Sequence, residues 1–200
     1  RPSDVQQLVD RLREVGSNIM VVAKIEKPEA VDCIEDIIDI TDAVMVARGD
    51  LGIEMRLSRV PGAQKKIIRT SLEAAKPVIT ATQMLESMIE NNTATRAEIN
   101  DIATAIFQGA DTVMLSAEAA IGKFPLQAVS TMTKTIISTE KYKKEHIEDF
   151  KNSIITKKKY LKIKKLHDEK RNDLIKNIRK IINEADKKHS YYLGGVEMIA

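Results

Sequence analysis

The sequence predicts an α/β fold built on a parallel sheet, followed by a basic helical segment. Short apolar runs alternate with patterns of helical period four times in succession within residues 1–142. The apolar runs are nearly continuous, which is typical of parallel strands that are covered on both faces. Charge then divides the chain, because residues 1–140 carry 15 Lys and Arg against 20 Asp and Glu, a net of −5, whereas residues 141–200 carry 17 against 9, a net of +8. We therefore expect a folded unit over 1–142 and a separate Lys-rich tail over 143–200.

Proline and glycine mark several ends of the predicted elements. The strands are predicted over residues 19–25, 43–47, 78–81 and 111–115, and the helices over 4–14, 28–38, 61–75, 96–107 and 125–142. Asp4 is the expected cap of the first helix, which Gly16 ends. Pro28 and Pro125 take the first positions of their helices, where no N–H is needed. Gly109 stops the helix that precedes the last strand.

Strand followed by helix, repeated four times, predicts parallel strands joined by right-handed crossovers. In such a sheet the loops after the strands gather at one end, which commonly carries the chemistry. Each predicted strand is followed by polar residues: Lys24 and Glu26; Arg48, Gly49 and Asp50; Thr82 and Gln83; Ser116 and Glu118. We therefore expect these residues to meet at one rim.

The residue types at this rim favour binding of a divalent cation and a phosphate. Lys24 and Glu26 are two apart and share one face of a strand. Glu26 and Asp50 supply two carboxylates, which suit Mg²⁺, and a lysine beside such a metal suits phosphoryl transfer. N–H groups around Gly49 could hold an anion at a helix start. The alternative is a structural Lys24–Glu26 pair followed by a plain turn over residues 48–52.

Other features narrow the class of protein. The three histidines all lie between residues 146 and 189, so a zinc site at the rim is not predicted. The single cysteine excludes an internal disulfide and fits a cytoplasmic protein. We find no signal-peptide pattern and no apolar run long enough to span a membrane. The first residue is Arg1, so we expect the chain to be the inside of a longer sequence.

Four motifs resemble consecutive blocks of one enzyme family. They are IMVVAKIEKPEAV at 19–31, MVARGDLG at 45–52, ATQMLESM at 81–88 and GADTVMLSAE at 109–118. In this order and at these spacings they resemble pyruvate kinase, and the resemblance ends at about residue 142. It implies the second half of a (β/α)₈ TIM barrel, four βα units long.

The resemblance implies transfer of a phosphoryl group from phosphoenolpyruvate to ADP, giving pyruvate and ATP in the last step of glycolysis. It also implies Mg²⁺ (or Mn²⁺), K⁺ and a homotetramer. By motif, Lys24 would stabilise the transferring phosphoryl group, while Glu26 and Asp50 would bind the Mg²⁺.

The remaining motif residues are implied to bind or support the substrate. Gly49, with the Asp50 amide beside it, would receive the substrate carboxylate, and Arg48 would support that loop. Thr82 would contact substrate near the carbon that is protonated. Ser116 and Glu118 would have supporting roles.

The resemblance also implies what the chain lacks. The first four barrel strands, with the potassium ligands and a phosphate-contacting arginine, are absent, as are the family's cap domain and C-terminal domain. Such a half barrel would expose an apolar inner face and two sheet edges. We therefore expect it to pair with a complementary half or with itself.

The Lys-rich tail allows a second hypothesis. Apolar residues recur at roughly helical spacing and predict an amphipathic helix around residues 156–187. A basic face of this kind could meet nucleic acid, anionic lipid or an acidic partner, although a solvated helix or weakly ordered sequence with no such role is the simpler explanation. The alternative function is accordingly a non-catalytic remnant or binding protein that uses the tail.

Overall fold

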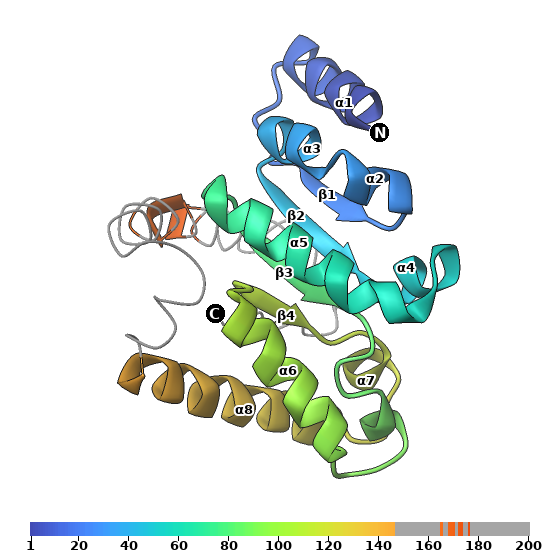
Figure 1. Cartoon of the computed structure of the whole chain (residues 1–200), viewed down its shortest axis with the longest axis vertical. Coiled ribbons are helices and arrows are strands. Elements are labelled where there is room, and N and C mark those ends of the chain that lie inside the picture. Colours follow the sequence, from blue (N-terminus) through green and yellow to red (C-terminus); the bar gives the residue numbers. More distant parts are fainter. Residues whose placement is uncertain (147–164, 166–167, 171, 174–175, 177–200) are drawn as a thin grey trace, which may run out of the picture.

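A computed structural model describes residues 1–146 together with residues 165, 168–170, 172–173 and 176. Four parallel strands alternate with helices along this part of the chain (Figure 1), which confirms the predicted α/β class. The strands are β1 (Val22–Ile25), β2 (Ala43–Ala47), β3 (Val78–Ala81) and β4 (Thr112–Met114), and they lie in that order in one sheet.

The helices follow the strands in the order expected of βα units. They are α1 (Pro2–Glu14), α2 (Pro28–Asp32), α3 (Ile34–Ile40), α4 (Arg48–Glu54), α5 (Val60–Glu73), α6 (Arg96–Gln108), α7 (Ala117–Ala120) and α8 (Pro125–Glu145), with short 3₁₀ turns η1 (Leu57–Arg59) and η2 (Glu86–Ile89). The predicted bounds of β2 and β3 are confirmed.

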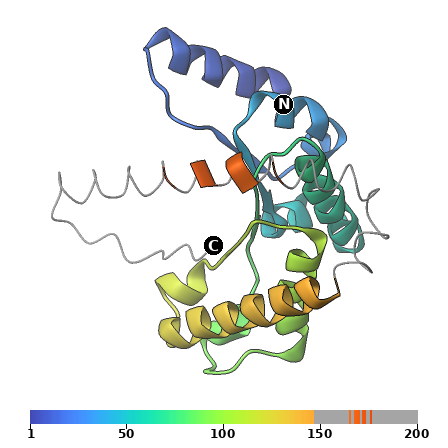
Figure 2. The same ribbon diagram turned by 90° about the vertical axis from the view of Figure 1, so that its left-hand side faces the viewer.

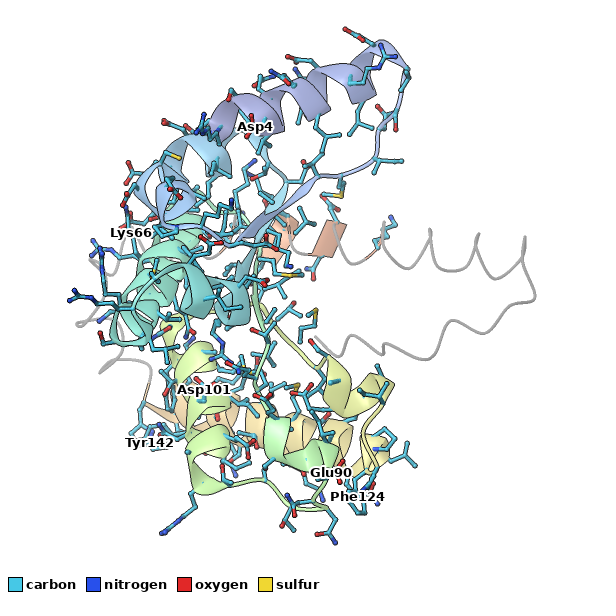
Figure 3. The ribbon with its side chains drawn as sticks, turned by 90° about the vertical axis from the view of Figure 1, so that its right-hand side faces the viewer. Asp4, Lys66, Glu90, Asp101, Phe124 and Tyr142 are labelled. Carbon is cyan, nitrogen blue, oxygen red and sulfur yellow. The ribbon has the colours of Figure 1, made fainter. Side chains whose placement is uncertain are left out.

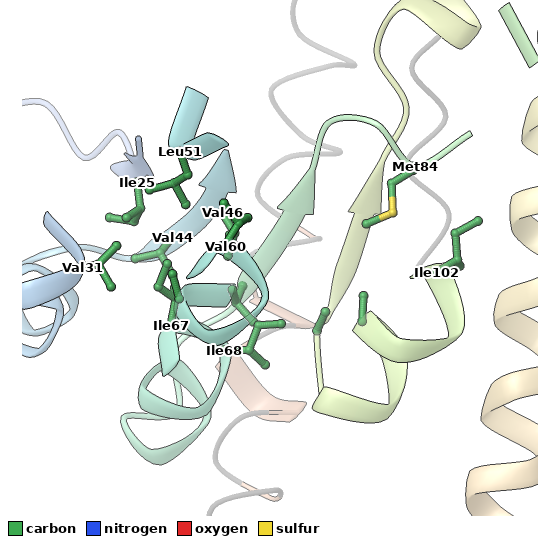
Figure 4. Close-up of a cluster of buried hydrophobic side chains, with 14 of the residues drawn as sticks. Ile25, Val31, Val44, Val46, Leu51, Val60, Ile67, Ile68, Met84 and Ile102 are labelled. Carbon is green, nitrogen blue, oxygen red and sulfur yellow. The ribbon is translucent and has the colours of Figure 1, made fainter. Parts of the chain in front are cut away.

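The main core lies between the sheet and the helices on one of its faces. Val44 and Val46 of β2 and Val78 of β3 are completely buried. Ile67 and Ile68 of α5 belong to the same cluster as Val44 and Val46 (Figure 4). In Figure 2 helix α5, coloured teal, lies to one side of the strands. Burial of several large aliphatic side chains, at about 25 cal/mol per Å² of apolar area, stabilises this layer.

The opposite face of the sheet is only partly covered. Successive side chains of a strand point to opposite faces, and the pairing places Lys24, Met45 and Ile79 in one row across three strands. Val22, two residues before Lys24, is 42% exposed, and Met45 and Ile79 are also accessible to solvent. Among the described residues, β1, β2 and β3 therefore present a largely apolar face that is partly accessible to solvent.

Several predicted bounds were wrong in detail. Helix α1 begins at Pro2, so Asp4 lies in its first turn and is not the cap. The strand predicted from residue 19 begins at Val22. The helix predicted over 28–38 is interrupted at Cys33, whose φ of −107° and ψ of 33° leave the helical region. The interruption divides it into α2 and α3.

Two carboxylates fix the starts of the strands. Asp42, just before β2, accepts a hydrogen bond from the Val21 amide at 2.7 Å. Asp111, just before β4, does the same for the Val78 amide at 2.9 Å. Val21 lies just before β1 and Val78 is the first residue of β3, so each aspartate satisfies a backbone donor at the start of the neighbouring strand and stabilises the parallel register.

The Lys-rich tail is described only at a few residues. These residues, at 165, 168–170, 172–173 and 176, are helical, and the rest of the helix predicted over 156–187 lies outside the described residues. Helix α8 continues to Glu145, three residues past the predicted boundary at 142. In the part of the chain that the structure describes, no helix combines the length and apolar character needed to cross a membrane.

Candidate active site

Polar side chains collect where the strands end. Lys24 lies within the last two residues of β1, and Arg48 follows β2 directly as the first residue of α4. Thr82 follows β3, and Ser116 lies two residues after β4. Since the carboxyl ends of parallel strands meet at one edge of a sheet, these residues share one rim.

Lys24 joins the two predicted metal ligands. Its ammonium contacts the carboxylate of Glu26 and lies 3.0 Å from Oδ2 of Asp50. The Lys24 side chain is 51% exposed, so the cluster faces solvent. The hydrogen bond to Glu26, followed by that to Asp50, raises the pKa of Lys24 above its ordinary value. Lys24 is therefore fully charged at neutral pH.

The same contacts test whether the site suits a divalent cation. Glu26 and Asp50 both reach the ammonium of Lys24, so their oxygens converge on one positive charge. Two carboxylates, with water and substrate oxygens completing the shell, match the usual protein contribution to a Mg²⁺ site. Among the described residues no cluster of three or more His, Cys, Asp or Glu side chains suits a metal. The donor types of Glu26 and Asp50 thus suit Mg²⁺.

The backbone after β2 is helical, in place of the plain turn of the alternative interpretation. Residues 48–54 form α4, and its first turn contains Gly49 and Asp50. The Gly49 amide donates a hydrogen bond to Oγ1 of Thr82 at 2.8 Å. A Cβ at Gly49 would lie 3.4 Å from that same oxygen, which is an ordinary van der Waals contact, so the hydrogen bond does not by itself require glycine.

Arg48 supports the neighbouring loop from beneath the rim. Its guanidinium is 10% exposed and donates to the Ala81 carbonyl at 3.3 Å and to the Thr82 carbonyl at 2.5 Å. It also pairs with Asp101 on α6 at 2.6 Å. The donors of Arg48 in these contacts are thus directed to the protein itself.

Thr82 and Gln83 adopt a backbone conformation that the sequence does not signal. Their φ angles are +70° and +54°, in the left-handed region. This region is a genuine outlier for a β-branched residue such as threonine. A residue held there costs about 1–3 kcal/mol, which the surrounding contacts must offset.

The last two predicted residues connect loops. Glu118 is 2% exposed, and its carboxylate accepts hydrogen bonds from the Leu85 amide at 3.1 Å and the Ser116 amide at 2.8 Å. It therefore joins the loop after β3 to the loop after β4. Ser116 contributes its backbone amide to this connection.

Two residues that the sequence analysis did not single out belong to this support. Asp101 pairs with Arg48, as above, and Gln64 lies 3.5 Å from Arg48 through its carbonyl oxygen. Gln64 is buried and also donates to Gln108 at 2.9 Å. The sequence offers one hint of these contacts, a polar residue within the apolar stripe of a helix. The hint is weak because polar residues at the helix surface give a similar pattern.

The chain is similar to one protein family over most of its described residues. The family model described as "Pyruvate kinase, barrel domain" matches residues 1–129. A pyruvate kinase of Mycobacterium intracellulare is 53% identical over 139 residues, covering 70% of this chain and 29% of that protein. A pyruvate kinase of Thermotoga maritima is 50% identical over 141 residues, covering 70% and 30% respectively.

A solved structure agrees with the sequence matches. The crystal structure of a pyruvate kinase from Cryptosporidium parvum superposes with a TM-score of 0.69 at 43% sequence identity, covering 70% of this chain and 30% of that one. The chain thus spans less than a third of the length of these relatives.

Proposed function

The chain belongs to the pyruvate kinase family, and from that premise we propose that it supplies half of a barrel that transfers a phosphoryl group from phosphoenolpyruvate to ADP. The products are pyruvate and ATP. The observation that carries the proposal is the convergence of Lys24, Glu26 and Asp50 at the rim, with Gly49 and Thr82 beside them.

In this proposal the charged cluster binds the reacting groups. The Lys24 ammonium, which the ordinary pKa of lysine already keeps protonated at neutral pH, stabilises negative charge on the transferring phosphoryl group. Glu26 and Asp50 hold Mg²⁺ or Mn²⁺. When bound, the cation neutralises charge on the substrate oxygens.

The neighbouring backbone orients the substrate. The amides of Gly49 and Asp50 receive the substrate carboxylate at the start of α4. The Gly49 amide already donates to Thr82, so a carboxylate arriving there would take over this donor and release the Thr82 hydroxyl. Thr82 then lies beside the carbon that gains a proton. Arg48, Ser116 and Glu118 hold these loops in place.

The proposed site is incomplete without a second barrel half. We assign residues 1–142 to a half barrel whose inner face, with Val22, Met45 and Ile79 accessible, packs against a complementary half or another copy. The K⁺ that the family uses would be bound by that other half. A tetramer of complete units and a cytoplasmic location belong to the same proposal.

Residues 143–200 are assigned to a separate Lys-rich segment. The alternative function, a binding protein that uses this segment, has no observation in its favour, because most of these residues lie outside the described part of the chain. No comparison supports nucleic-acid binding either.

A coupled assay tests the proposal. The full chain is co-expressed with the barrel half that precedes the matched segment in the Mycobacterium relative, and pyruvate formation is followed with lactate dehydrogenase in Mg²⁺ and K⁺. We expect activity that Lys24→Met abolishes and that Lys134→Met, on the exposed side of α8, leaves intact. Inactivity of the assembly and of the chain alone would overturn the proposal.

A further inference from the structure

Among the described residues, Asp101 on α6 contacts the rim through Arg48. We propose that Asp101 is a positioning residue, which holds the Arg48 guanidinium in the orientation that shapes the turn at Thr82 and Gln83. Through that turn it also sets the direction of the Gly49 amide. The proposal rests on the proposed function for its kinetic consequence, but its structural consequence can be measured independently.

The turn needs support from outside its own residues. Thr82 and Gln83 take φ angles of +70° and +54° in succession, without glycine to ease either position. Such conformations persist only when surrounding contacts hold them, and they cluster at functional sites. The Thr82 hydroxyl, which accepts from Gly49 and donates to the Ala81 carbonyl at 2.7 Å, depends directly on this geometry.

Arg48 supplies the required contacts with a single planar group. Its Nε and Nη2 donate to the carbonyls of Ala81 and Thr82, the two peptide oxygens on either side of the turn's first residue. A guanidinium offers several donors in a fixed plane, so rotating it would break both bonds together. The conformation of the turn therefore depends on the orientation of the Arg48 side chain.

Asp101 fixes that orientation. Its Oδ2 accepts from Nη1 of Arg48 at 2.6 Å. The side chain of Arg48 is 10% exposed and that of Asp101 is 35% exposed, so the arginine side of the pair is shielded from solvent. A short charge-assisted bond between partly buried groups is stronger and more directional than an exposed ion pair. Figure 3 labels Asp101 on α6.

Helix α6 is a firm base for this contact. Its first turn has a capping box, in which Thr95 accepts from the Glu98 amide at 3.3 Å and the Thr95 amide donates to Glu98 at 2.8 Å. Glu98 also accepts from the Ser87 amide at 2.7 Å. The helix thus holds the segment after β3 at two points, Thr82 through Asp101 and Arg48, and Ser87 through Glu98.

An ion pair that merely stabilises the fold would act differently from a positioning residue. It would change stability while leaving the turn at Thr82 and the Gly49 amide unaltered. Substitution of a positioning residue changes the turn at Thr82 and the Gly49 amide while the fold is kept. The effect of that substitution disappears when Arg48 is also replaced. These differences define the test.

The structural arm uses amide chemical shifts of the full chain. We expect Asp101→Asn to shift the amide resonances of Gly49 and Thr82 in the same direction as Arg48→Lys. Glu73→Gln, which removes the exposed pair with Arg69 on α5, should leave them unchanged. Unchanged Gly49 and Thr82 resonances in Asp101→Asn would overturn the proposal.

The kinetic arm uses the full chain assembled with the complementary barrel half. We expect Asp101→Asn to lower kcat by about 10- to 100-fold, as small misplacements do, with little change in KM for ADP. Asp101→Glu should restore part of the loss, and Asp101→Asn should add little to Arg48→Lys in the double variant. Losses that multiply in the double variant would overturn the proposal, whereas an inactive parent assembly would refute the proposed function and leave the amide shifts to decide.

Discussion

The ammonium of Lys24 lies 3.0 Å from Oδ2 of Asp50 and also contacts Glu26, so one lysine occupies the point on which both carboxylates converge. A divalent cation bound by the same carboxylates would have to share or replace that position. The lysine and the cation are thus competitors for the carboxylates as well as partners in the proposed chemistry.

This competition predicts that Lys24→Met binds Mn²⁺ more tightly than the parent chain. Removing one positive charge about 4 Å from a divalent metal gains about 2 kcal/mol in a water-like environment, or roughly 30-fold in Kd. Electron paramagnetic resonance titration with Mn²⁺ measures the change without requiring activity. Glu26→Gln should weaken binding, and Lys134→Met is the control. Weaker Mn²⁺ binding by Lys24→Met would contradict competition for the carboxylates.

Glu118 should be important for stability because of the two amides it accepts from. In Glu118→Ala the buried amide of Leu85 and the partly buried amide of Ser116 lose their partner, and the unsatisfied Leu85 amide alone costs about 1–3 kcal/mol. Glu118→Gln keeps an acceptor and should cost less. Urea unfolding of the full chain compares the two variants. Equal losses would indicate that packing, and not the hydrogen bonds, explains the effect.

The lowered pKa of Glu98 predicts that its contribution to the free energy of unfolding depends on pH. Burial is the largest single influence and raises the pKa of Glu98, but hydrogen bonds from Ser87 and Thr95 together outweigh it and hold the pKa below its ordinary value of 4.5. A carboxyl whose pKa is lower in the folded state stabilises the fold above its unfolded pKa and loses this contribution as pH falls through the folded pKa.

The stability difference between the parent chain and Glu98→Gln should therefore be constant near neutral pH and shrink below about pH 4.5, the ordinary value. Chemical unfolding at a series of pH values measures this difference. Glu90→Gln, at an exposed pair with Lys123, is the control. A difference that stays constant down to the most acidic pH would contradict the assigned hydrogen bonds.

The sequence predicted the parallel order of the strands and the bounds of β2 and β3 because those strands have clear punctuation. Asp42 precedes β2, and Pro77 precedes β3, so an apolar run begins sharply in each case. The break at Cys33 was missed because the isoleucines that follow it continue the helical spacing. Local periodicity carries no information about a one-residue interruption.

The residues of the candidate site were predicted from the same periodicity and from motifs. The contacts between these residues could not be predicted from the sequence. Lys24 and Asp50 were placed at one rim because parallel strands end together. The positive φ of Thr82 occurs beside hydrogen bonds from Arg48 and Gly49, which are more than 30 residues away in the sequence. Asp101 was missed because a single acidic residue on a helix most often faces solvent.

Two glycines test how far backbone conformation governs the fold. Gly109 ends α6 at φ +102°, and a Cβ there would lie 2.5 Å from Cδ1 of Leu72. Gly62 lies in α5, and a Cβ added to it would meet no atom within 4 Å. Gly109→Ala should therefore destabilise by about 1–3 kcal/mol through backbone strain, whereas Gly62→Ala should stabilise by up to about 1 kcal/mol because alanine favours helices.

Thermal and urea unfolding of the two variants give the comparison within one chain. Both substitutions add a single methyl group, so a difference of opposite sign isolates the effect of position. Leu72→Ala combined with Gly109→Ala separates the close contact from the strain, because the smaller side chain removes the contact and leaves φ unchanged. If Gly109→Ala did not destabilise the parent chain, a residue with a left-handed φ would not be required to end α6 before β4.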